Sequence, residues 1–302
     1  MSVLDCIGNT AIVRLDRINP NPKVRIYAHL ECNNPGGSIK DRTALYMIRN
    51  GVAEGKLKPG TTILEATSGN TGIGIAMVGA AMGYKVKLAM PECVSTERRK
   101  ILEAFGAEVV LSPGCEATDG AIRLAHKIYD ANRDKYYMPD QFTNPANILA
   151  HYETTGKEVY EQTHGEISVF VAGMGTTGTL MGTGKRLKEY NSSISIIGVE
   201  PNVGHKIQGL KNMTEAIVPK IYNPRALDEI RPIEDDDAFN MTRRLAIEEG
   251  LLVGMSSGAA MWVAAQKAGE MKSGVIVVIL PDRGDRYLST ALFTSVCAKC
   301  PP

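Results

Sequence analysis

A lysine in the segment NNPGGSIKDR, residues 33–42, is the first candidate for covalent chemistry in the sequence. A Pro-Gly-Gly turn signal precedes it, and apolar residues of helical spacing follow it. Ser38 and Asp41 have the spacing of a capping box, which predicts a helix that begins at Ser38. Lys40 is then expected in the first helical turn, where the partial positive charge of the helix end lowers the pKa of an amine. Such a lysine is a candidate Schiff-base nucleophile, with an ordinary solvated surface lysine as the alternative.

Three further segments are rich in glycine, hydroxyl and amide groups. TSGNTG, residues 67–72, suits a carboxylate, although it also fits a plain turn with a cap. GTTGT, residues 175–179, suits a phosphate at a helix N-terminus, because glycine permits close backbone approach and threonine adds donors. In VGMSSGAA, at least one of Ser256 and Ser257 is expected to cap the next helix, and the other to present a neutral hydroxyl to a ligand.

The second half of the chain also permits a competing interpretation. Gly173, Gly175 and Gly178 read G-x-G-x-x-G. Glu200 follows at about the distance expected for an acid that binds a ribose. These residues alone would fit a dinucleotide site in a colourless, nicotinamide-binding protein, but that interpretation explains neither Lys40 nor TSGNTG.

The elements that must position these loops alternate along the chain. Strands are expected at 61–66, 86–90, 108–111, 167–172, 194–200 and 275–280. Helices are expected at 95–105, 118–131, 235–249 and 257–272. This alternation predicts an α/β protein with mostly parallel sheets flanked by helices. The loop PDQFTNPAN, residues 139–147, is the expected internal boundary, and ligands should bind in a cleft at the carboxyl ends of the strands.

Composition narrows the class of protein. The 302 residues carry 34 Lys and Arg against 33 Asp and Glu, with one Trp and five Phe, so neither nucleic acid nor an anionic membrane is an expected partner. The sequence shows no signal peptide and no apolar run long enough for a bilayer. Six scattered cysteines favour a reducing, cytoplasmic setting. Cys297 and Cys300 have the spacing of a redox or metal half-site, but without a second pair we expect an ordinary tail and no metal.

Six motifs in order resemble the cysteine synthases, or O-acetylserine sulfhydrylases, which are fold type II (tryptophan synthase β-like) enzymes dependent on pyridoxal 5′-phosphate. They are NNPGGSIKDR, EATSGNTG, DQFTNPAN, GMGTTGT, GMSSGAA and DRGDRYLST. The resemblance runs from residue 7 to about residue 293. It implies a smaller mobile domain of residues 36–145 and a larger domain of residues 1–35 plus 146–302. The active site would lie in the cleft between them, and the chain would form a homodimer.

The resemblance also implies a role for each matching residue. Lys40 would hold the cofactor as an internal aldimine and act as the catalytic acid and base, and Asn70 would lie beside the cofactor's 3′ oxygen. The residues expected to bind the substrate α-carboxylate are Thr67, Ser68, Gly69, Thr71 and Gln141. The residues expected to bind the cofactor phosphate are Gly175, Thr176, Thr177, Gly178 and Thr179. Ser256 would face the pyridine nitrogen and leave it unprotonated, which favours elimination over transamination.

The reaction implied is β-replacement, which forms L-cysteine from O-acetyl-L-serine and sulfide or thiosulfate through an α-aminoacrylate intermediate. O-phosphoserine-dependent cysteine synthesis, cystathionine β-synthase chemistry and serine or threonine dehydration are the alternatives within the same fold. GTTGT and DRGDRYLST resemble the B-type isozyme, whereas HKIQG resembles the A-type. Lys211 stands where B-type relatives typically have arginine, and is either a cation for thiosulfate or a substrate phosphate, or a solvated loop charge. A serine acetyltransferase tail is a further candidate partner for the cleft.

Overall fold

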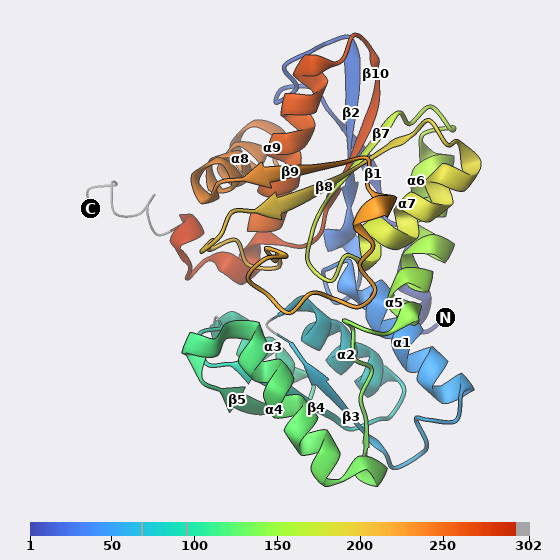
Figure 1. The fold of residues 1–302 in the computed structure, drawn as a ribbon, viewed down its shortest axis with the longest axis vertical. Helices are drawn as coiled ribbons and strands as arrows, with labels where there is room; N and C mark the ends of the chain where they lie inside the picture. The colour runs from blue at the N-terminus through green and yellow to red at the C-terminus, as the bar shows by residue number, and fades with distance from the viewer. Residues whose placement is uncertain (68, 95, 294–302) are drawn as a thin grey trace.

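The computed structural model describes residues 1–67, 69–94 and 96–293 (Figure 1). Ser68, Cys297 and Cys300, which the sequence singled out, lie outside the described residues. The described chain contains two separate sheets, seen one above the other in Figure 1. The predicted α/β class with mostly parallel sheets is confirmed, because β1 and β2 form the antiparallel pair and the other ladders are parallel.

The larger sheet has the strand order β1-β2-β10-β7-β8-β9. Its strands are β1 (Ile12–Leu15), β2 (Val24–Leu30), β7 (Val169–Gly173), β8 (Ser195–Pro201), β9 (Glu229–Ile233) and β10 (Gly274–Leu280). Alternate residues of the central strands face opposite cores, as a pleated strand requires. Val169, Val171, Ile276 and Val278 pack in the core that includes residues of α8 (Asp235–Glu249) and α9 (Met255–Glu270). Residues between them, such as Phe170 and Val277, pack in the core that includes α7 (Gly178–Tyr190).

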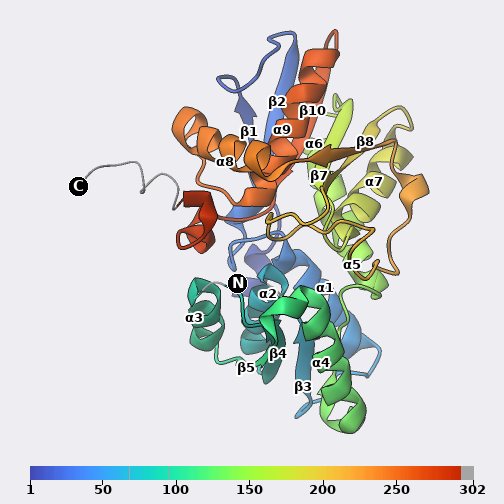
Figure 2. The ribbon, with the colours of Figure 1, turned by 60° about the vertical axis from the view of Figure 1, so that its left-hand side comes forward.

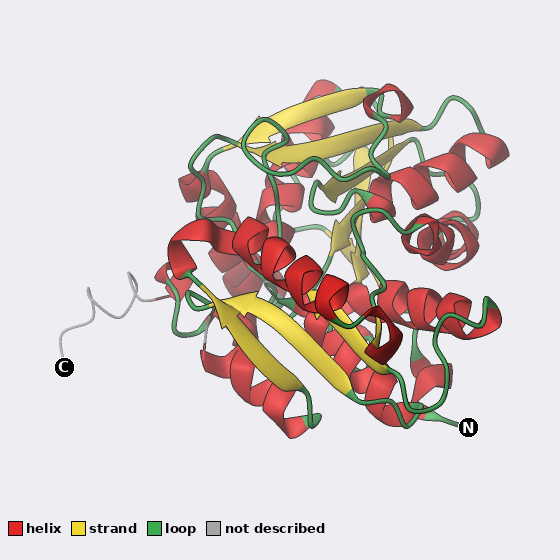
Figure 3. Ribbon diagram, turned by 60° about the horizontal axis from the view of Figure 1, so that its bottom comes forward, coloured by secondary structure: helices red, strands yellow, loops and turns green. Residues whose placement is uncertain are grey.

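The smaller sheet has the order β5-β4-β3-β6. Its strands are β3 (Thr62–Ala66), β4 (Val86–Pro91), β5 (Glu108–Ser112) and β6 (Tyr136–Tyr137). Helices cover both of its faces, as Figure 3 shows. One face packs with α1 (Lys40–Ala53) and α2 (Asn70–Ala81). The other packs with α4 (Ala117–Ala131) through small alanine side chains, and α4 is seen in front of β3 in Figure 2.

The remaining helices connect or flank these layers. They are α3 (Thr96–Ala104), α5 (Pro145–Ala150) and α6 (Gly156–Gln162), with a π-helical turn at His151–Thr155 between the last two. The predicted strands and helices are present, with ends that differ by no more than two residues, but the sequence analysis did not identify β1, β2, β6 and β9. Each sheet has its own apolar core, which fits the predicted division. The limits of two domains at 36–145 and at 1–35 plus 146–302 remain a prediction.

Two predicted helix starts are wrong. The first helix begins at Lys40, and its N-cap residue Ile39 provides no side-chain hydrogen bond. Ser38 is buried and pairs with Asp282 in an isolated β-bridge, and its hydroxyl accepts a hydrogen bond from Lys40 N at 3.2 Å, so it lies two residues before the helix. The Asp41 carboxylate accepts a hydrogen bond from Gly36 N at 2.6 Å, which closes the preceding turn and not a capping box.

The predicted serine cap of α9 is wrong as well. The helix begins at Met255, Gly254 is its N-cap residue, and no side chain caps it. Ser256 and Ser257 therefore both lie inside the first turn, at 4% and 0% exposure. Because Ser256 lies beyond the capping position, its hydroxyl is left for the cavity described next.

Candidate active site

One cavity brings together most of the residues that the sequence predicted. Six segments that are distant in sequence contribute predicted residues to it: the start of α1, the loop and helix at 67–71, the loop at Gln141, the loop before α7, the loop at Lys211 and the start of α9. The predicted residues that line it are Lys40, Thr67, Gly69, Asn70, Thr71, Gln141, Gly175, Thr176, Thr179, Lys211 and Ser256. Thr177 and Gly178 belong to the same loop but do not line the cavity, and Ser68 lies outside the described residues.

Lys40 is the first residue of α1, and its side chain reaches the cavity. Burial lowers the pKa of its amine, while the negative charges of Asp282 and Glu31 act in the opposite direction. The direction of the predicted pKa shift is confirmed, and its largest cause is desolvation by burial. A partly desolvated amine loses its proton more easily, so Lys40 is suited to act as a nucleophile and base.

The TSGNTG segment joins β3 to α2 and makes a compact turn. The Thr67 hydroxyl accepts hydrogen bonds from Gly69 N and Gly72 N, each at 3.1 Å. Thr71 donates from its hydroxyl to Gln141 Oε1 at 2.6 Å, and Gln141 Nε2 donates to Ala66 O at 3.0 Å. The residues predicted to bind the substrate carboxylate therefore lie together at the end of β3. They come from two loops that are 70 residues apart, joined by the hydrogen bond from Thr71 to Gln141.

The GTTGT loop is closely packed around the start of α7. Thr177 has a φ of 68°, a left-handed conformation that is uncommon for threonine, and it is the N-cap residue of α7. Its hydroxyl oxygen is buried and has no hydrogen-bond partner in the described part of the chain. A Cβ at Gly175 would lie 2.6 Å from the carbonyl oxygen of Gly209, so only glycine fits there. The loop thus places a left-handed residue and a glycine that permits close backbone approach at the N-terminus of α7, which suits a phosphate.

A buried histidine, His151, contacts residues of α1 and of the start of α7. His151 Nε2 lies 3.2 Å from Thr43 Oγ1 and 3.4 Å from Thr179 Oγ1, and Nδ1 lies 3.0 Å from Thr155 Oγ1. Burial, with the nearby charge of Lys40, lowers the pKa of His151 to about 3. The imidazole is therefore neutral, and it connects α1 to the start of α7 by hydrogen bonds alone.

Lys211 is not a solvated loop charge, so that alternative is wrong. Its side chain is 11% exposed, and Nζ lies 3.4 Å from Asp119 Oδ1 and 5.0 Å from the centre of the Phe142 ring. It lines both the main cavity and an outer cavity of about 510 Å³ beside it. Lys211 thus lies at the passage between the two spaces, with its charge partly neutralised by α4.

The ribose-binding role suggested for Glu200 fails. Its carboxylate accepts a hydrogen bond from Met213 N at 2.7 Å, so it holds the loop after β8. Sequence analysis also gave no role to DRGDRYLST, although two of its residues reach the cavity wall. Asn70 Nδ2 donates to Asp282 Oδ2 at 2.6 Å, and Arg286 Nη1 donates to Asn70 Oδ1 at 2.6 Å. These partners lie more than 210 residues apart, so no local pattern could have identified them.

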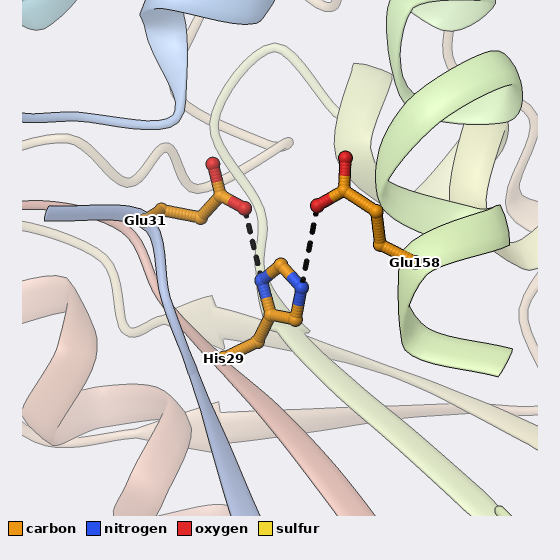
Figure 4. Close-up of side chains that lie close together, drawn as sticks. All are labelled: His29, Glu31 and Glu158. Atoms are coloured by element: carbon orange, nitrogen blue, oxygen red, sulfur yellow. Dashed lines mark ion pairs between the residues drawn. The ribbon is translucent and has the colours of Figure 1, made fainter. Parts of the chain in front are cut away.

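A second group of titratable side chains lies on the other side of α1. Figure 4 shows His29 between the carboxylates of Glu31 and Glu158. His29 Nδ1 is 2.9 Å from Glu31 Oε1, and His29 Nε2 is 3.7 Å from Glu158 Oε2. Arg42 lies 2.9 Å from Glu31 and 2.6 Å from Glu158. The guanidinium is therefore the cation of this group, the Arg42 cluster, and takes the place that a metal would need.

The features of the main cavity fit pyridoxal phosphate, the cofactor that the resemblance implies. Lys40 offers an amine to an aldehyde. The glycine backbone before α7, with Thr176 and Thr179 beside it in the cavity wall, suits a phosphate. Ser256 offers a neutral hydroxyl, as the sequence suggested for the pyridine nitrogen. These residues come from opposite sides of one cavity, as a ligand with an aldehyde and a phosphate group requires.

Comparison with known proteins agrees with this chemistry. Residues 3–282 match the family described as pyridoxal-phosphate dependent enzyme. The chain is 47% identical to the cysteine synthase of Aquifex aeolicus, over 97% of this chain and 92% of that protein. It is 44% identical to cysteine synthase B of Escherichia coli, over 97% of this chain and 96% of that protein.

A solved structure is also closely similar. The O-acetylserine-dependent cystathionine β-synthase of Helicobacter pylori is 38% identical, with a TM-score of 0.91, over 97% of this chain and 98% of that chain. In the part of this chain that the structure describes, every helix is too short or too polar to cross a bilayer. From its matched residues, its near full-length similarity and its cavity, the chain belongs to the pyridoxal-phosphate-dependent enzymes and is a member of their cysteine synthase family.

Proposed function

We propose that this protein forms L-cysteine from O-acetyl-L-serine and sulfide. The observation that carries the proposal is the position of Lys40, a desolvated amine in the same cavity as the TSGNTG unit and the start of α7. Bound pyridoxal phosphate supplies an electron sink, which stabilises negative charge at the substrate α-carbon while a β-substituent departs. The protein's part is to bind the substrate, place its α-carbon near Lys40 and move one proton.

Lys40 performs two tasks in this proposal. Its amine would hold the bound cofactor, and once free it would remove the α-proton of the substrate. After the sulfur nucleophile has added, the same amine returns the proton. An amine whose pKa is lowered toward the working pH serves both directions, because it is neither permanently charged nor too weak a base.

The remaining predicted residues bind and orient. Thr67, Thr71 and Gln141 would bind the substrate carboxylate, with the loop N–H groups as further donors. Their present hydrogen bonds to one another keep these groups ordered before substrate arrives. Asn70 would face the cofactor's 3′ oxygen, and Ser256 would leave the pyridine nitrogen uncharged. Movement of the segment 36–145 toward the rest of the chain would exclude water while the substrate reacts.

Formation of cystathionine is the second candidate function. The similar Helicobacter pylori structure carries that activity in its name. The outer cavity of about 510 Å³ opens beside the main one and has space for a sulfur nucleophile larger than sulfide. Lys211 at the passage also favours anionic donors such as thiosulfate, or an O-phosphoserine substrate, although lysine lacks the two-pronged geometry of arginine.

Cellular location and partners follow from the resemblance. We propose a cytoplasmic homodimer that uses small-molecule substrates. A serine acetyltransferase tail is a further candidate ligand of the cleft. A pull-down with the free enzyme, repeated with the cleft filled by substrate, tests that partner, and light scattering in solution tests the dimer.

A substrate panel on the purified holoenzyme tests the function. O-acetyl-L-serine would be combined in turn with sulfide, thiosulfate and L-homocysteine, and O-phospho-L-serine with sulfide. Products would be identified by mass spectrometry. We expect the highest kcat/KM for O-acetyl-L-serine with sulfide. Faster cystathionine formation would favour the second candidate, and pyruvate without a thiol product would indicate dehydratase chemistry. A holoenzyme that forms no thiol or thioether product would refute both candidates.

A further inference from the structure

The segment after β10 connects the two sides of the cavity through its backbone. Ile39 N donates to Pro281 O at 2.9 Å, directly before Lys40. Gly254 N donates to Asp282 O at 3.2 Å, directly before α9 and Ser256. The motif DRGDRYLST, residues 282–290, therefore begins at the point where the α1 and α9 sides of the cavity meet.

The side chains of Asp282 and Arg286 fix the orientation of the Asn70 side-chain amide. Asn70 Nδ2 donates to the Asp282 carboxylate, and Asn70 Oδ1 accepts from the Arg286 guanidinium, each at 2.6 Å. A half-turn of the amide would place its NH₂ group against the guanidinium and its oxygen against the carboxylate. Both contacts would be repulsive, so the amide has a single favourable orientation. One hydrogen on Asn70 Nδ2 is left without a partner among the described residues, on a side chain that lines the cavity.

Arg286 also fixes the turn that precedes Lys40. Its side chain is nearly buried, and Nη2 donates to the carbonyl oxygen of Gly36. Gly37 has a φ of 78°, and Arg286 would obstruct a Cβ there. The guanidinium thus joins the Asn70 amide to the turn at 36–37, and it sets the position of Asn70 relative to the start of α1.

The Asp282 carboxylate is itself held in place. The residue is fully buried, and Tyr287 donates its hydroxyl to the same oxygen that accepts from Asn70. A Cβ at Gly254 would collide with the other carboxylate oxygen, so that side is closed by backbone. A charged acceptor with two donors and no space to rotate has one arrangement.

From this geometry we propose that Asp282 and Arg286 are positioning residues, which lock the Asn70 side chain as a hydrogen-bond donor toward the bound cofactor. The lock does not require either residue to touch the cofactor. It rests on the proposed function only through Asn70, and not on the identity of the substrates. Under this proposal the DRGDRYLST motif contributes to cofactor binding through Asn70. A local sequence pattern could not indicate this role, because the motif and Asn70 are far apart in sequence.

The test measures cofactor binding and not turnover. Apoenzyme of Arg286→Gln, Asp282→Ala and Asn70→Ala would be titrated with pyridoxal phosphate, and the visible absorbance of each loaded protein recorded. We expect each of the three to weaken binding by about tenfold, the effect of losing one fixed hydrogen bond, and to change the ratio of the visible bands. In the double variant Asn70→Ala/Arg286→Gln, we expect binding within about threefold of Asn70→Ala alone, because both changes remove the same contact.

A matched control separates the lock from general damage. Arg283→Gln changes an exposed arginine of the same segment, and it should bind cofactor within about twofold of wild type. Should Arg286→Gln fail to fold, Arg286→Lys replaces it, with an expected loss of about threefold because one of the two contacts survives. Normal binding and spectrum in a folded Arg286 or Asp282 variant, or additive losses in the double variant, overturn the lock. An unchanged Asn70→Ala would instead remove the proposed role of Asn70.

Discussion

Two cations in one helical turn of α1 have opposite environments. Lys40 reaches the main cavity, and among the described residues Asp282 and Glu31 attract its charge without forming an ion pair with it. Arg42, two residues later, is 1% exposed and donates to both Glu31 and Glu158. Burial raises the free energy of either charge, but direct carboxylate partners compensate only Arg42.

The pKa values of the Arg42 cluster and of Lys40 show what this difference in pairing does. Burial alone would raise the pKa of Glu31, but Arg42 and His29 outweigh it and hold that pKa well below its usual range. The pKa of Arg42 is raised in turn, because the two carboxylates outweigh its own desolvation. The pKa of Lys40 is lowered, because nothing compensates its burial to the same extent. A paired buried charge is therefore fixed and structural, whereas an insufficiently paired one is available for chemistry.

Replacement of Lys40 gives the largest expected effect and tests the reactive side of the comparison. For Lys40→Ala we expect cysteine formation to fall by at least about 10³-fold, because the anchor and the acid–base group are lost together. The unfolding free energy of the apoenzyme should stay within about 1 kcal/mol of wild type, since no direct ion pair is removed. Activity assays and urea unfolding measure the two quantities. Full turnover in this variant would disprove the catalytic role.

Replacement of Arg42 tests the structural side. Arg42→Met leaves Glu31 buried without its main counter-charge, which should lower the unfolding free energy by about 3–5 kcal/mol. Arg14→Met is the matched control, because Arg14 and Asp16 form an exposed pair at 51% and 64% side-chain exposure. That change should cost about 0–1 kcal/mol. Urea unfolding measures both variants. Equal losses of unfolding free energy would contradict the distinction between buried and exposed ion pairs.

The pH dependence of stability tests a buried group that stays neutral. The pKa of His151 is lowered to about 3 in the folded chain, from an ordinary 6.5. Below about pH 6.5 the unfolded chain binds a proton there that the folded chain does not, so stability is complete above that pH and falls as the pH drops toward about 3. One proton corresponds to about 1.4 kcal/mol per pH unit.

The variant His151→Asn removes this titration. The unfolding free energy of wild type relative to the variant should therefore fall by about 1.4 kcal/mol between roughly pH 6 and pH 5. Urea unfolding at both pH values measures it. His126→Asn, at an exposed position, controls for the substitution itself. A wild-type-to-variant difference that is constant with pH would show that His151 is not held neutral.

Substitution of Lys211 gives the smallest expected effect, because the positive charge of Lys211 is paired less closely than that of Arg42 but more closely than that of Lys40. Its Nζ is 3.4 Å from a carboxylate that is 25% exposed. We expect Lys211→Met to raise the KM for thiosulfate by about three- to tenfold and to change kcat with sulfide by less than about twofold. Asp119→Asn frees the Lys211 charge and should lower the same KM. Steady-state kinetics with both donors decides this, and an unchanged KM in both variants would place Lys211 outside the donor's path.

Local signals in the sequence predicted much of the fold and of the site. Apolar runs and turn residues located β3, β4 and β5 of the smaller sheet and most of β7, β8 and β10, because side-chain period and backbone preferences depend on neighbouring residues. The glycine- and hydroxyl-rich loops were identified as ligand-binding segments for the same reason, and eleven of the thirteen described candidates line one cavity. Strands β1 and β2 were missed. The segment 24–30 alternates apolar residues with arginine, tyrosine and histidine, which is the period of a strand, but the parallel neighbour that completes its pairing, β10, is distant in sequence.

The sequence by itself determined which residues could do chemistry: an amine after a tight turn, a hydroxyl-rich unit and a glycine loop before a helix. Only the tertiary structure decided their state. It pairs Arg42 with Glu158, 116 residues away, whereas Lys40 has no ion-paired partner among the described residues. It also places Asn70 between Asp282 and Arg286, at separations of 212 and 216 residues. Desolvation and charge pairing depend on which atoms meet after folding, and that arrangement is a property of the packed chain and not of any local segment.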